Sequence, residues 1–154
     1  MAKKKIIQFV ALFFIPFIVF NSCNHADQLI QNNSKYGDDE SHNMGENCMN
    51  CHKKGGDGDG WFYIAGTAYT NDGKKTAEDV TVIMFTEPDG QGIVKKIIEG
   101  DKLGNFYTTD ITGFGNGLFP AIVYNNDTTF MSSSTTNGSC NSCHGNSTSK
   151  IEVY

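Results

Sequence analysis

The chain contains no arginine, and all twelve of its basic side chains are lysines. Arginine holds phosphate and other oxyanions through two parallel hydrogen bonds, so its absence removes the usual means of gripping such a ligand. Seventeen acidic residues outnumber the lysines and give a formal net charge of −5. We therefore expect no nucleic-acid partner, and a protein partner with a basic patch would suit this surface better.

The sequence also lacks any run of ten or more residues with apolar side chains at helical spacing. Short aromatic and β-branched runs begin at Trp61 instead, in the order WFYIAGTAYT, VTVIMFT, IVKKII, GNFYTTD and LFPAIVY. Asn-Asp-Gly, Pro-Asp-Gly and Gly-Asn turns separate these runs, as is typical of a β-sandwich. We predict a mainly β protein with a small sandwich over residues 61–136 and a closing strand in the final KIEVY.

The stretch AGTAYTNDGKKTAEDVTVIMFTEPDG, followed by GNFYTTD, resembles the carboxypeptidase-regulatory-like, or prealbumin-like, family of sandwiches. The likeness covers about residues 63–125, and includes the valine-rich strand and the Gly-Asn-Phe that enters the next one. The Pro and Gly that usually precede the valine-rich strand are replaced by residues 76–79. The resemblance implies an immunoglobulin- or prealbumin-like fold and no particular activity.

The longest apolar run is short and lies near the start of the chain. It covers residues 6–20, follows three lysines, and is interrupted by Gln8 and Pro16. This order is typical of a secretory signal peptide, and the run is shorter than a usual membrane span, although a retained anchor is the alternative. The small Ser22 before Cys23 resembles a bacterial lipoprotein signal, which implies that Cys23 is lipidated after cleavage.

Cleavage before Cys23 defines residues 1–22 as the signal peptide and residues 23–47 as a polar, lipid-anchored tether. It removes three lysines and no acidic residue, so nine lysines face seventeen acids and the net charge becomes −8. Asn24 is not the aspartate associated with retention in the inner membrane. We therefore expect an exported protein anchored to a membrane that faces the periplasm or the cell surface, with the outer membrane favoured.

Only five cysteines and four histidines are present, yet they spell Cys-x-x-Cys-His twice, as CMNCH and CNSCH. A shuffled chain would contain one such pentapeptide with a probability of roughly a few in a thousand. Covalent c-type haem needs two thiols for its neighbouring vinyl groups and an imidazole for the iron, and this spacing provides them. The residues that we assign to two covalent haems c are Cys48, Cys51 and His52, and Cys140, Cys143 and His144.

The haem-binding segments are residues 48–60, which end in a glycine-rich linker, and residues 137–154, which include the closing strand. Zinc bound by paired Cys-x-x-Cys motifs and disulfides in an oxidising compartment are the alternatives. Neither of them requires a histidine after both second cysteines. A thioredoxin-like redox motif needs a βαβ frame, which the sequence lacks.

Two residues are candidates for the sixth position on the irons. His42 lies six residues before the first pentapeptide, and six extended residues reach about 20 Å, enough to pass round a haem edge. Met131 lies nine residues before the second pentapeptide, at the end of a strand run. The simplest assignment pairs His42 with His52 and Met131 with His144, although the ends of the sandwich could exchange these partners. For Met84 we predict a core position.

Two such pentapeptides behind an export signal resemble small exported multihaem c-type cytochromes with a β-sandwich between their attachment sites. The resemblance implies an electron carrier rather than an enzyme, which passes one electron per haem to redox partner proteins while tethered to a membrane. One alternative is a small haem peroxidase or reductase, which needs an open iron and a pocket acid or base. The other is a sensor or a subunit of a larger multihaem assembly.

Overall fold

The structure is a computed structural model and describes residues 31–154. The predicted signal peptide, residues 1–22, and the predicted lipidation site, Cys23, lie outside these residues. No helix within the described part of the chain combines the length and the apolar character that crossing a membrane requires.

The prediction of a mainly β protein with a small sandwich is confirmed, because the strands form two four-stranded sheets. In the first sheet β1 pairs antiparallel with β4 and parallel with both β7 and β8. The strands of this sheet are β1 (Ile64–Thr70), β4 (Asn105–Thr108), β7 (Gly138–Ser139) and β8 (Ile151–Val153). The second sheet, antiparallel throughout, has the order β3 (Val94–Glu99), β2 (Thr81–Phe85), β5 (Phe119–Tyr124) and β6 (Asp127–Phe130).

The alternation of side chains along β2 explains how the second sheet covers the core. Val82 and Met84 are buried, whereas the residues between and beside them are partly exposed. Asn125 and Asn126 both have positive φ, the conformation that a tight two-residue hairpin between β5 and β6 requires. The buried core cluster includes Ile64, Val80, Val82, Met84, Ile98, Phe106, Leu118, Ile122 and Val153.

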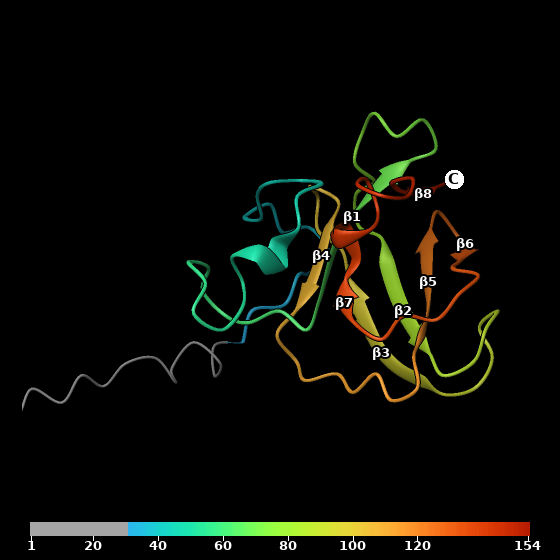
Figure 1. Cartoon of the computed structure of the whole chain (residues 1–154). Coiled ribbons are helices and arrows are strands. Elements are labelled where there is room, and N and C mark those ends of the chain that lie inside the picture. The colour runs from blue at the N-terminus through green and yellow to red at the C-terminus, as the bar shows by residue number, and fades with distance from the viewer. Residues whose placement is uncertain (1–30) are drawn as a thin grey trace, which may run out of the picture.

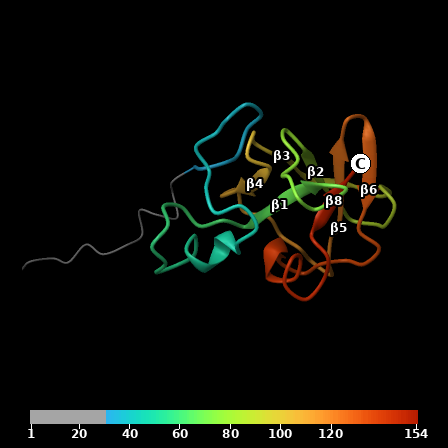
Figure 2. The ribbon, with the colours of Figure 1, turned by 90° about the horizontal axis from the view of Figure 1, so that it is seen from above.

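The second pentapeptide lies between two strands of the first sheet, β7 and β8. β7 pairs with β1 at Ile64 and Ala65, and β8 pairs with the same strand from Ala68 onward. Residues 140–150 therefore leave the sheet and return to it almost at the same place on β1. Figures 1 and 2 show the short helical turn of this excursion, in red, beside the corresponding turn of the first pentapeptide, in teal.

Candidate functional site

The first pentapeptide folds into a single 3₁₀ turn, η2 (Cys48–Asn50). The side chain of Asn47 caps the turn by accepting a hydrogen bond of 3.2 Å from a backbone N–H inside it. The N–H groups of Cys51 and His52 both donate to the carbonyl of Cys48, over 3.2 and 3.0 Å. The chain thus closes tightly enough to gather both thiols and the imidazole around one turn.

The second pentapeptide repeats this geometry in η3 (Cys140–Ser142). The N–H groups of Cys143 and His144 donate to the carbonyl of Cys140, over 3.2 and 2.9 Å. Ser139 takes the capping position that Asn47 holds in the first turn. Two segments far apart in the sequence therefore adopt one conformation, which follows from their shared spacing.

Both histidines present the same ring nitrogen to a backbone carbonyl. Nδ1 of His52 lies 2.9 Å from the carbonyl oxygen of Asp59, and Nδ1 of His144 lies 2.9 Å from that of Ser149. Because a carbonyl only accepts, Nδ1 carries the proton and Nε2 keeps a free lone pair. Histidines that bind metals usually donate their other ring N–H in this way. Both imidazoles therefore leave Nε2 available to bind a metal.

The structure brings the predicted pair His42 and His52 together. Their ring centroids are 6.1 Å apart, with the planes inclined by 37°, and both rings line a cavity of about 310 Å³, here called the first cavity. Two imidazoles that bind one metal ion are separated by two metal–nitrogen bonds of about 2 Å each and by half the width of each ring. These lengths add up to roughly the separation of the two centroids. The two rings are therefore separated by about the distance expected of two imidazoles that share one metal ion.

A buried polar network holds His42 in place. The side-chain amide of Asn105 donates to Ser41 Oγ and to the carbonyl of His42, over 2.9 and 3.1 Å. Its oxygen accepts from Thr67 Oγ1, which in turn accepts from the N–H of Gly45. Sequence reasoning missed this role, because the Gly-Asn before the strand indicated only a turn.

An aromatic stack supports His52 from the sheet. The ring of Phe62 lies parallel to that of His52 at 4.1 Å, and Tyr107 continues the stack at 4.7 Å. Sequence reasoning missed this stack, because both aromatic residues stand in the runs WFYIAGTAYT and GNFYTTD, which predict only strands.

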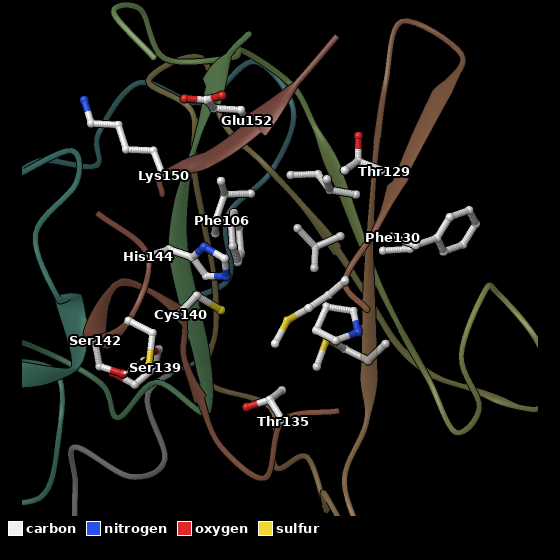
Figure 3. A pocket seen from close by; sticks show the side chains of 18 of the residues that line it. Phe106, Thr129, Phe130, Thr135, Ser139, Cys140, Ser142, His144, Lys150 and Glu152 are labelled. Carbon is white, nitrogen blue, oxygen red and sulfur yellow. Dashed lines mark hydrogen bonds between the residues drawn. The ribbon is translucent and has the colours of Figure 1, made fainter. Parts of the chain in front are cut away.

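The second cavity, of about 300 Å³, lies between the sheets and is lined by Cys140, Cys143 and His144. Figure 3 shows His144, Cys140 and Phe106 on one side of this cavity and the strands of the second sheet on the other. The predicted pair His144 and Met131 shares this cavity, and Met84, predicted as a core residue, is buried and lines it as well. Other apolar lining residues are Val82, Pro120, Ala121, Ile122 and Ile151.

The two cavities differ in their charged surroundings. Glu40 and Glu46 line the first cavity, together with several asparagines. The carboxyl group of Asp101 is fully buried nearby, and after burial itself it is a further cause that raises the pKa of the Cys48 thiol. In the second cavity, burial, helped by the nearby Cys48 thiol, raises the pKa of Cys140 to about 12.

The two turns touch each other. Ser139 Oγ donates a hydrogen bond of 2.8 Å to Oδ1 of Asn47, across a sequence separation of 92 residues. Each of these residues directly precedes the first cysteine of its pentapeptide. The two attachment turns therefore lie next to one another, as both ribbon views show.

The donor sets fit two covalent haems. All four pentapeptide cysteines are free thiols, and each cavity is lined by two of them and by the imidazole of the same turn. Among residues 31–154 no three His, Cys, Asp or Glu side chains come close enough together to hold a bare metal ion.

No protein-family model matches the chain, and a search of curated proteins and of solved structures finds no similar protein.

Proposed function

We propose that the chain is a dihaem c-type cytochrome that carries electrons, one per haem. The observation that carries this proposal is the repeated turn, in which both imidazoles donate Nδ1–H to a backbone carbonyl and keep Nε2 free beside a cavity. Haem iron, when bound, supplies one-electron chemistry, and the protein sets its potential through ligands and burial.

In the first cavity the chain offers two imidazoles, His52 and His42, with carboxylates close by. Nitrogen ligands and negative charge both stabilise ferric iron, so this haem has the lower potential. In the second cavity His144 faces thioether side chains and apolar walls. A thioether ligand stabilises ferrous iron, so this haem has the higher potential. Electrons entering at the first haem then pass downhill to the second.

The contact between Asn47 and Ser139 supports transfer between the two sites, because the attachment turns are joined by a hydrogen bond. A peroxidase or reductase is less well supported, since both cavities contain a candidate sixth ligand and the chain has no arginine. We further propose that the mature protein begins at a lipidated Cys23, is anchored to the outer membrane, and exchanges electrons with proteins that present basic patches.

The decisive experiment is an intact mass of the protein matured in a host with cytochrome c assembly machinery. We expect a mass increase of two haems that survives acid–acetone extraction. A double Cys140→Ala, Cys143→Ala variant should retain one haem and serves as the matched control for the second site. Bound zinc, or no retained haem, would contradict the proposal.

The membrane anchor is tested separately. Cys23→Ser should release the protein into the soluble fraction with both haems attached, because Cys23 lies outside both pentapeptides. A variant that stays with the membrane would rule out the lipid anchor while leaving the haem assignment intact.

A further inference from the structure

The cavity beside His144 is lined by two methionines, Met84 and Met131. Resting on the function proposed above, we propose that these two thioethers are interchangeable sixth ligands to the second haem iron. The proposal follows from their place in the sheet, from the chemistry of the competing side chains in the cavity, and from the flexibility of the methionine side chain.

The two methionines belong to one row across the second sheet. Met84 in β2 is the register partner of Pro120 in β5. The N–H of Met131 donates to the carbonyl of Pro120 over 2.9 Å, one step beyond the pairing of Ala121 with Phe130. Cross-strand partners project from the same face of a sheet, so both thioethers leave the sheet on one side, with the proline between them.

That side is the wall opposite His144. The neighbouring row, Val82, Ile122 and Thr129, lines the same cavity, which identifies the face. Figure 3 shows Thr129 and His144 on opposite sides of the cavity. The Ser149 carbonyl accepts a hydrogen bond from Nδ1 of His144. This bond orients the ring and leaves the lone pair of Nε2 free.

The cavity lining holds three other candidate ligands, Lys150, Glu152 and Tyr154. Within the described residues, the remaining histidines, His42 and His52, line the first cavity. Lys150 lines the second cavity, but its Nζ donates to the carbonyl of Gly73 over 2.9 Å and lies 4.1 Å from the ring centroid of Tyr69. Glu152 and Tyr154 offer only oxygen ligands, and Tyr154 is 64% exposed, so a thioether suits the sixth position of a ferrous iron better.

The spacing allows either methionine to serve. Each lies one strand spacing, about 4.8 Å, from Pro120, and an unbranched side chain with three rotatable bonds spans that distance. Met84 approaches from the core and is 1% exposed, whereas Met131 approaches from the half-buried rim. The proposal places the iron within reach of both thioethers, so that exchange between them would need only rotation of side chains.

The test uses the matured holoprotein and three variants, Met84→Leu, Met131→Leu and the double change, because leucine keeps the volume of methionine. The readout is the near-infrared sulfur-to-iron band of the ferric protein. We expect both single variants to keep most of the band and the double variant to lose it. Met44→Leu is the control, since Met44 is exposed and lines neither cavity.

Loss of the band in either single variant would show one fixed ligand and overturn the proposal. A band that persists in the double variant, or is absent from the unaltered protein, would overturn it too. If the first double variant does not fold, Met84→Leu combined with Met131→Ala replaces it. The two variants differ only at Met131, which lies at the half-buried rim of the cavity. Intact masses separate this failure from failure of the proposed function, because two haems must be attached in every variant.

Discussion

Asp101 is the buried carboxylate nearest to the first pair of thiols. Its Oδ1 accepts from the N–H groups of Leu103 and Asn105, over 2.9 and 3.0 Å, whereas its Oδ2 has no hydrogen-bond partner. A buried charge without full compensation acts strongly on its surroundings. After burial itself, Asp101 is the next cause that raises the pKa of Tyr107, which lines the first cavity.

Removing this charge should raise the potential of the first haem. In Asp101→Asn we expect the lower-potential wave to shift upward on the order of 50 mV, or about 1 kcal/mol for one electron, because ferric iron loses a stabilising charge. The higher wave should move less. Redox titration measures both, with exposed Asp57→Asn as the control. An unchanged lower wave would mean that Asp101 does not act on this iron.

The cysteines of the second turn should differ sharply in reactivity when the chain carries no haem. Burial raises the pKa of Cys140 to about 12, so this thiol stays protonated up to higher pH. Because each pKa unit is a tenfold change in thiolate, its reactive fraction at pH 8 is roughly a thousandfold below that of an ordinary thiol. We expect iodoacetamide to label the exposed Cys143 first, as measured by peptide mass spectrometry. Equal labelling rates would refute this expectation.

Strand β4 joins the sandwich to the segment that carries His42. Asn105 makes this connection with both ends of its amide, and it is 1% exposed. Its replacement leaves several buried groups without partners, which costs about 1–3 kcal/mol for each group. The position of His42 therefore depends on a buried residue of the sheet, which also lines the first cavity.

Asn105→Leu should weaken both the fold and the ligation of the first haem. The free energy of unfolding should fall by about 2 kcal/mol, and the bis-histidine spectrum should change, because His42 loses its support. Thr108→Val is the matched control, since Thr108 is equally buried on β4 but bonds to Asn33 instead. Denaturation and electron paramagnetic resonance report the two effects. If both variants alter the spectrum equally, the network is merely structural.

Strand β7 leads directly into the second pentapeptide. Its Gly138 leaves no room for a side chain. A Cβ added at Gly138 would lie 2.0 Å from the carbonyl oxygen of Tyr63 and 2.6 Å from Cα of Ile64. Backbone atoms cannot yield as a flexible side chain does, so β7 must separate from β1. We expect Gly138→Ala to lower the free energy of unfolding by about 1–3 kcal/mol.

The same change should lower the occupancy of the second haem site more than that of the first, as counted by intact mass. Gly113→Ala serves as the control, because nothing lies within 4 Å of a Cβ added there. Full and equal occupancy of both sites in Gly138→Ala would show that the second turn forms without its strand.

The sandwich was predictable because most of its strands are runs of aromatic and β-branched residues between turn residues. The continuous β-branched run VTVIMFT predicts β2, and the turn residues on either side predict its boundaries. β7 was not predictable, because Gly-Ser carries no strand signal and pairs only through its backbone. The acceptors for His52 and His144 were hidden for the same reason, since a carbonyl has no side-chain signature. The core position predicted for Met84 is confirmed, whereas its place in the lining of the second cavity was not foreseen.

For the whole molecule, surface charge should govern encounter with partners. The proposed cleavage before Cys23 would leave nine lysines and seventeen acidic residues. Electron exchange with a small cationic redox protein should therefore slow as salt rises, because screening removes the attraction. Exchange with an anionic reagent such as ferricyanide should instead accelerate. Stopped-flow rates across ionic strength measure both, and identical salt dependences would contradict electrostatic steering.

The contact between Asn47 and Ser139 also makes the distance between the two turns an indicator of folding. In the proposed dihaem protein, thioether bonds would keep both cofactors on the chain after denaturation, whereas this contact exists only in the folded sandwich. An unfolded segment of 92 residues separates its ends by roughly 50 Å on average. Magnetic or optical interaction between two neighbouring irons fades over such a distance. The strength of that interaction would therefore measure the fraction of molecules in which the two turns are in contact. The measurement needs no added label.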